Sequence, residues 1–141
     1  MVQTSSDYQP VPKSKRFANY LIDILIYFVV MLVVGFVMGI FFAIVGNIGF
    51  LDTSGFELLA NFLGFIILFL YYFLFELFFQ ATPGKFITNT RVKARSGVEL
   101  DAQRIALRSI IRLVPFEPFS FLFGEGWHDK WSKTVVVENA S

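Results

Sequence analysis

The residues best suited to chemistry in this sequence are a few charged side chains set in or beside long apolar stretches. Arg16 and Asp23 are seven residues apart, so they share one face of a helix, and Asn19 lies between them. Glu76 interrupts a second apolar stretch. A carboxylate in hydrocarbon must pair, line water or stay protonated. Two carboxyls at similar depth disfavour each other's ionised form, and such a pair could exchange a proton for a cation.

The same acids also have a structural interpretation. Arg104, Arg108 and Arg112 recur every four residues and therefore share one helical face. An ion pair from Asp23 or Glu76 to one of these arginines would pin the arginine-bearing helix to the apolar segments. Proton–cation exchange and structural pinning both remain open from the spacing alone.

Catalytic and metal chemistry has little support. Cysteine is absent and His128 is the single histidine, so a disulfide, a thiolate site and a multi-histidine metal site are excluded. The turn from Thr82 to Lys85 lacks the glycine spacing of a phosphate-binding loop. His128 and Asp129 would be the best catalytic candidates, but we expect Asp129 to bridge to Arg108 or Arg112. We expect no enzyme, no cofactor and no metal.

Two apolar segments must position these side chains. The chain has 141 residues, of which 55% are hydrophobic and 16% charged, and its 19 phenylalanines exceed what so small a soluble domain can bury. Residues 24–46 carry no charge and would form a helix of about 34 Å, enough to cross a bilayer core of roughly 30 Å. We predict transmembrane helices over about 17–45 and 58–79, joined by a polar link over 47–56.

The distribution of basic residues predicts the orientation of this hairpin. Of the 12 Lys and Arg residues, Lys13, Lys15 and Arg16 precede the first helix, none lies between the helices, and the others follow the second. Cytoplasmic segments of membrane proteins are enriched in these residues. We therefore expect a multi-pass membrane protein with a cytoplasmic N-terminus and the link outside.

Strand signals follow the second helix. The chain alternates over 87–95, with one face formed by Thr88, Thr90, Val92 and Ala94 and the other by Asn89, Arg91, Lys93 and Arg95, which predicts a short strand with one basic face. Ser96 and Gly97 form a plausible turn into 98–100, and 134–137 is a second β-prone run. These pieces predict a small cytoplasmic sheet.

An amphipathic helix and an aromatic segment are expected between these strands. Asp101 is a candidate N-cap for a helix over about 102–114, whose arginine face we expect to meet anionic lipid headgroups. Residues 115–123 are aromatic but too few to cross a bilayer. A re-entrant or interfacial segment is therefore favoured over a third span.

Gly35 and Gly39 form a G-x-x-x-G pattern in the first predicted helix. Small residues at this spacing let two helices approach closely. The pattern fits packing within the hairpin and a dimer face equally well.

Several motifs resemble the RDD family of bacterial membrane proteins, which is named for one arginine and two aspartates. The segment 15–23, KRFANYLID, resembles the opening of the family's first helix. Thr82-Pro83-Gly84-Lys85 resembles the T-x-G-K turn after its second helix, and Arg91-Val92 its following strand. The matches continue in family order to residue 137 through Arg108, Arg112, His128, Asp129 and Thr134-Val135-Val136.

The resemblance implies particular roles. It makes Arg16 the named arginine and Asp23 and Asp129 the two aspartates. It also implies a transport role, with cation/proton antiport suggested for some members. The apolar segment before His128 is shorter than in many members, which favours two spans.

Together these observations predict an all-α membrane protein, and the resemblance implies that its membrane is the bacterial inner membrane. It would comprise a two-helix transmembrane hairpin, a short amphipathic or re-entrant segment with a third span as the alternative, and a small cytoplasmic β element. Residues 1–15 would form a flexible tail and 16–137 an RDD-like domain.

The expected function is transport-related, with exchange of a cation against a proton. A non-transporting scaffold or assembly partner is the alternative. Two helices alone enclose no pathway, so we expect a homo-oligomer. The expected partners are the bilayer and its anionic headgroups, not nucleic acid. The candidate functional residues are Arg16, Asp23, Glu76 and Asp129, supported by Asn19, Thr82, Gly84, Lys85, Arg108, Arg112 and His128.

Overall fold

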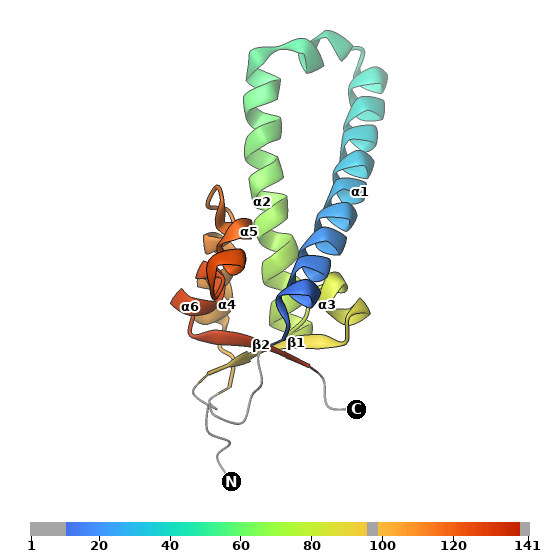
Figure 1. The fold of residues 1–141 in the computed structure, drawn as a ribbon. Coiled ribbons are helices and arrows are strands. Elements are labelled where there is room, and N and C mark those ends of the chain that lie inside the picture. The colour runs from blue at the N-terminus through green and yellow to red at the C-terminus, as the bar shows by residue number, and fades with distance from the viewer. Residues whose placement is uncertain (1–10, 96–98, 139–141) are drawn as a thin grey trace.

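Two long helices dominate the computed structural model, which describes residues 11–95 and 99–138 (Figure 1). Helix α1 covers Lys13–Val45 and α2 covers Ser54–Phe79, with a short 3-10 helix, η2 (Ile48–Asp52), between them. Gly46 ends α1 in the left-handed region, at a φ of 74° that glycine adopts without strain. The two helices stand side by side on a small base of short elements, and they diverge toward η2.

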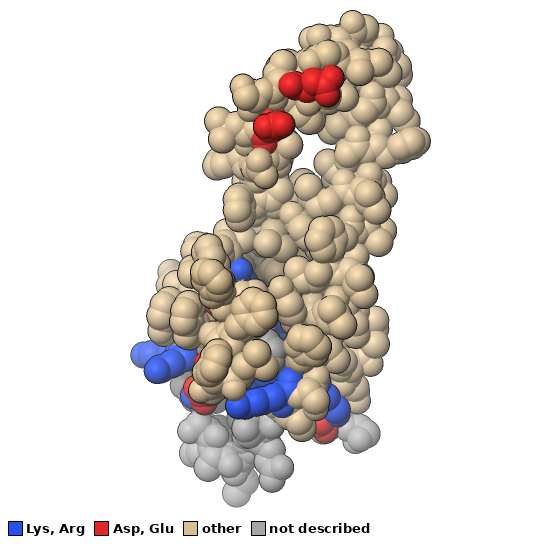
Figure 2. Space-filling model, turned by 45° about the horizontal axis from the view of Figure 1, so that its top comes forward, with Lys and Arg blue, Asp and Glu red and all other residues tan. Residues whose placement is uncertain are grey.

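Both helices are long and apolar enough to cross a membrane, and they alone meet this test within the described residues. Of the residues in the most apolar stretch of each helix, 0% in α1 and 11% in α2 are buried inside the protein. The core helix of a soluble domain would be mostly buried. Figure 2 shows an uncharged zone between the acidic residues near η2 and the basic residues of the base. These features fit a membrane protein with a helical hairpin.

The helices extend beyond their predicted starts. Helix α1 begins at Lys13 and α2 at Ser54, inside the predicted polar link. Residues 1–10 of the predicted tail lie outside the described residues. Val11 is already part of the fold, because its side chain is buried and its backbone N–H donates to the carbonyl of Val136 at 3.3 Å.

The base contains the predicted sheet. Strand β1 (Thr90–Ala94) pairs antiparallel with β2 (Thr134–Glu138), with Val92 opposite Val136. Alternate residues of β1 are buried, as its sequence pattern predicts. The predicted strand over 98–100 is wrong for its two described residues, because Glu99 and Leu100 form no strand. The predicted turn at Ser96 and Gly97 lies outside the described residues.

Five short helical segments complete the base. Helix α4 (Ala102–Ile111) has the predicted N-cap, since the Asp101 carboxylate accepts from the Arg104 N–H at 2.8 Å, but it ends three residues early. The aromatic segment forms two short helical pieces. Two of the helices stand where no helix was predicted. The segments other than α4 are α3 (Pro83–Ile87), α5 (Glu117–Ser120), the 3-10 helix η3 (Phe121–Phe123) and α6 (Trp127–Trp131).

Helix α4 and its C-cap turn Arg108 and Arg112 inward, opposite to the sequence-based expectation. The side chain of Arg108 is fully buried and that of Arg112 is 10% exposed, whereas Leu107 and Ile110 are 44% and 53% exposed. Phe123 of the following segment is 92% exposed. The prediction that these two arginines face lipid headgroups is therefore wrong. Polar residues inside and apolar residues outside fit a helix surrounded by lipid, where apolar surface is not costly to expose.

The two glycines of the G-x-x-x-G pattern do not pack within the hairpin. Apart from the neighbouring residues and backbone of α1 itself, no described heavy atom lies within 4 Å of a Cβ built on Gly35 or Gly39. The close approach is lower down, where the Tyr27 hydroxyl donates to the carbonyl of Gly64 at 3.0 Å. A dimer face at Gly35 and Gly39 remains a prediction.

Candidate functional site

Asp23 joins α1 to α2 and to the first turn of α3. Asp23 is 1% exposed, and its carboxylate accepts three hydrogen bonds from neutral donors. The Tyr71 hydroxyl donates to Oδ1 at 3.0 Å, the Gly84 N–H to Oδ1 at 2.8 Å, and the Thr82 hydroxyl to Oδ2 at 2.5 Å. Asp23 forms no ion pair with any described residue, so the predicted pairing of this acid with an arginine does not occur.

Gly84 is required by the closeness of α3 to α1. A Cβ at this position would overlap the backbone oxygen of Asn19 and lie 2.9 Å from Oδ1 of Asp23. The side chain of Asn19 adds a second tie, since its amide lies between the hydroxyls of Thr88 and Thr90, at 3.1 Å from the latter. The T-x-G-K turn is thus fastened to the first helix.

Glu76 lies behind these contacts and is surrounded by cations. Its fully buried carboxylate accepts from Lys85 at 3.0 Å, from Arg108 Nε at 2.7 Å and from Arg112 at 3.2 Å. The prediction that Glu76 pins the arginine-bearing helix to the hairpin is confirmed. Glu76 and Asp23 have separate sets of partners, so the two acids do not share a proton here.

Asp129 forms the second buried acidic centre. Its Oδ2 accepts from Arg16 at 2.9 Å, and its Oδ1 accepts from Arg108 and, at 3.4 Å, from the Thr134 hydroxyl. The predicted bridge from Asp129 to Arg108 is confirmed. Arg16 contacts Asp129 although its sequence spacing had linked it to Asp23.

Arg108 connects the two acidic centres. Its Nε donates to Glu76. Its Nη1 donates to Asp129 and, at 2.8 Å, to the Thr134 hydroxyl. One fully buried guanidinium therefore holds α2, α4, α6 and β2 together. A buried charge of this kind is tolerated only when its partners are all in place.

The buried charges of the base shift one another's pKa values. Burial opposes ionisation of Asp129, but Arg108 and Arg16 outweigh it and hold the pKa of Asp129 well below its usual range. Burial lowers the pKa of Lys85 to about 8, although Glu76 acts in the opposite direction. Burial also works against the charge of Arg112, yet Glu76 raises the pKa of Arg112 above its ordinary value.

A contact that the sequence analysis missed joins Glu117 to His128. The Nδ1 of His128 lies within hydrogen-bond distance of Oε1 of Glu117. Burial disfavours ionised Glu117, but the bond from His128 prevails and lowers the pKa of Glu117. Burial also lowers the pKa of His128. A neutral imidazole that donates to an ionised carboxylate explains both directions. The only sequence signal was an acid inside an aromatic segment.

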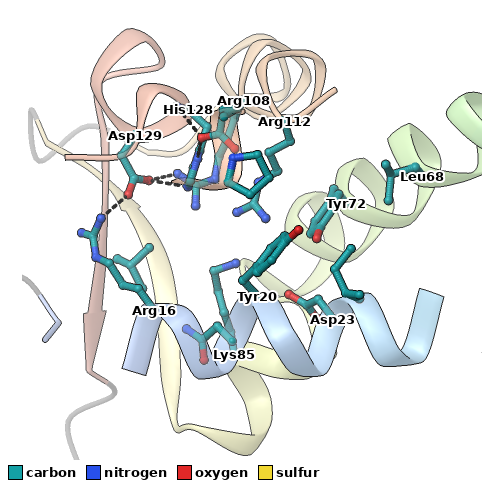
Figure 3. A pocket seen from close by; sticks show the side chains of 15 residues that line it. Arg16, Tyr20, Asp23, Leu68, Tyr72, Lys85, Arg108, Arg112, His128 and Asp129 are labelled. Atoms are coloured by element: carbon teal, nitrogen blue, oxygen red, sulfur yellow. Dashed lines mark hydrogen bonds and ion pairs between the residues drawn. The ribbon is translucent and has the colours of Figure 1, made fainter. Parts of the chain in front are cut away.

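A cavity of about 160 Å³ lies among these groups (Figure 3). Tyr20, Tyr72 and Glu117 also line it and were not predicted. Glu76, Thr82 and Gly84 are not among its lining residues, and Gly35 and Gly39 lie elsewhere in α1. The predicted residues that the fold brings to the cavity are Arg16, Asn19, Asp23, Lys85, Arg108, Arg112, His128 and Asp129.

The described residues include no group of three or more His, Asp or Glu side chains arranged to hold a metal ion. What the cavity offers instead is a set of permanent cations beside carboxyls and aromatic hydroxyls. Such a set can bind a charged group or relay a proton.

Comparison with known proteins gives one match. The model of the RDD family matches residues 11–125, which include Arg16, Asp23, Gly84 and Arg108. The match ends before His128. No curated protein and no solved structure matches the chain.

Proposed function

Because the chain belongs to the RDD family, we propose that it is a transport-related protein of the bacterial inner membrane whose cavity is the site of ligand entry. Both termini would lie in the cytoplasm and residues 47–56 outside, in accordance with the distribution of Lys and Arg. The apolar faces of α1 and α2 are open along most of their length. Two such helices enclose no pathway, so the functional unit would be a homo-oligomer.

The observation that carries this proposal is that the buried acids have different kinds of hydrogen-bond partner. Glu76 and Asp129 are held by permanent cations, and protonating either one would break ion pairs. Asp23 lines the cavity and is held by neutral donors alone among the described residues. It can exchange a proton or a small cation without leaving an arginine unpaired. Asp23 is therefore our candidate for the exchanging carboxyl.

Flux measurements on the purified protein in liposomes test this assignment. A sodium or potassium gradient should drive proton movement, read with a pH-sensitive dye trapped inside. Asp23→Asn should abolish the flux, whereas Asp52→Asn, which changes an exposed acid of the link, should leave it unchanged. Absence of flux under sodium, potassium and lithium gradients would overturn the proposal. Equal flux from wild type and Asp23→Asn would do the same.

A second candidate is a non-transporting scaffold. It is favoured by the Glu76–Arg108–Asp129 network, which ties the hairpin to the base and uses most of the buried charge for cohesion. This candidate predicts that Asp23→Asn lowers stability without affecting any flux. It also predicts a stoichiometric partner protein after pull-down from native membranes. A homo-oligomer with measurable flux and no partner would contradict it.

A further inference from the structure

Two buried arginines at the cavity have unused hydrogen-bond donors. Arg108 Nη2 and Arg112 Nε are buried and meet no acceptor among the described residues. The Arg112 guanidinium also binds Glu76 and lies 4.2 Å above the Tyr72 ring. Buried guanidinium N–H groups are rarely left without an acceptor. The two arginines therefore point to an acceptor that comes from outside the described chain.

These groups face one shared space. Arg108 and Arg112 line the cavity from the end of α4 and Lys85 lines it from α3, and Figure 3 shows their side chains turned toward one another. The three carboxyls that line the cavity already have partners: Asp129 has Arg16 and Arg108, Glu117 has His128, and Asp23 has its three neutral donors. The remaining binding capacity of the cavity is thus for an anion with several acceptor oxygens, and a phosphate group has this chemistry.

Part of the cavity wall is apolar. Ile24 and Leu68 line it from the two long helices, and Pro118 and Val136 line it from the base. A small free ion would leave these side chains in contact with water. An amphiphile would place its charged group on the arginines and its first carbons against Ile24 and Leu68, which continue into the apolar surfaces of α1 and α2.

We propose that the cavity binds the phosphate group of an anionic membrane lipid, with the phosphate on Arg108 and Arg112 and the start of its acyl chains along Ile24 and Leu68. The proposal rests on the proposed function in treating the cavity as the ligand site, and it names the class of that ligand. The sequence analysis expected lipid headgroups to contact an exposed arginine face. The fold turns Arg108 and Arg112 inward, so the proposed lipid contact lies in the cavity instead.

The test uses the full chain in a neutral detergent. The probes are dioleoyl phosphatidylglycerol, dioleoyl phosphatidylcholine and sodium phosphate, and the readouts are the thermal midpoint and lipid adducts in native mass spectrometry. Phosphatidylglycerol should raise the midpoint and form a one-to-one adduct, whereas phosphatidylcholine should do neither. Loss of a charge-assisted hydrogen bond should weaken the apparent affinity by about tenfold or more.

Three variants make the test specific. Arg112→Gln should lose the lipid-dependent shift, and Arg104→Gln should keep it, because Arg104 lies on the same helix but does not line the cavity. Leu68→Trp fills the cavity and removes no charge, so it should lose the shift while its midpoint in detergent alone stays near that of wild type. If Arg112→Gln fails to fold, Leu68→Trp decides the question.

Each outcome has one meaning. Equal effects of the two lipids, or no effect of either, would overturn the proposal. Stabilisation by sodium phosphate equal to that by phosphatidylglycerol would support the oxyanion site but overturn the lipid as its source. Selective lipid binding without ion flux would overturn the proposed exchange and support the lipid site. Ion flux without selective lipid binding would support the exchange and overturn the lipid site.

Discussion

Arg16 and Asp129 are 113 positions apart and form an ion pair of 2.9 Å in which the Asp129 side chain is fully buried. The pair joins the first turn of α1 to α6, and Arg108 extends it to Glu76 on α2. The charged residues of the RDD motifs therefore hold the base of the hairpin together and, at the same time, form one side of its cavity.

Removing the charge of Asp129 should destabilise the protein strongly. Asp129→Asn leaves Arg16 and Arg108 without their counter-charge in a buried site, which costs about 3–5 kcal/mol. Glu138→Gln is the matched control, because it removes an exposed ion pair with Lys15 and should cost about 0–1 kcal/mol. Urea unfolding in detergent measures both. Equal effects of the two substitutions would contradict the assignment of the buried network.

Adding a methyl group at Gly84 should disturb the contact between α3 and α1. Gly84→Ala places a Cβ against Asn19 and Asp23, and overpacking of this kind costs about 1–3 kcal/mol. Gly49→Ala is the control, since a Cβ built there meets no described atom within 4 Å beyond its own local backbone and chain neighbours. Thermal unfolding of both variants checks the difference. A Gly84→Ala protein as stable as wild type would show that α3 does not lie this close to α1.

The pKa of His128 makes stability depend on pH in a defined window. Burial holds the pKa of folded His128 below its ordinary value of 6.5, so the unfolded chain binds the proton first as the pH falls. Its contribution to stability should be complete above pH 6.5 and decline below it. His128 is the single histidine, so thermal midpoints measured between pH 5 and 8 should depend less on pH in His128→Gln. Identical profiles would refute this.

The outward apolar face of α4 and the segment after it should be shielded by lipid. The chain has no cysteine, so single cysteines report exposure without background. In nanodiscs, Ile110→Cys and Phe123→Cys should react slowly with a membrane-impermeant maleimide, and Lys130→Cys should react fast. All three should react equally after denaturation in SDS. Fast labelling at Ile110 and Phe123 in nanodiscs would place this face in water.

Local pattern in the sequence was sufficient for the elements whose formation depends on neighbouring residues. The two apolar runs predicted α1 and α2, alternation predicted β1, and Asp101 was recognised as an N-cap because its hydrogen bond closes within three residues. The family resemblance selected Arg16, Asp23 and Asp129 as a related set. The short helices α3 and α6 were missed, since five residues are too few to show a helical period.

The tertiary structure decided which way α4 faces and which charges meet. An amphipathic pattern distinguishes a polar from an apolar helix face. Which face turns inward depends on whether water or lipid surrounds the helix, and on the charged side chains of the elements packed against it. Here Glu76 and Asp129 both require the guanidinium of Arg108, so the arginines turn in and Leu107 turns out. The pairs Arg16–Asp129 and Glu117–His128 likewise join different segments of the chain. Their distance along the sequence does not tell how close they lie in the fold.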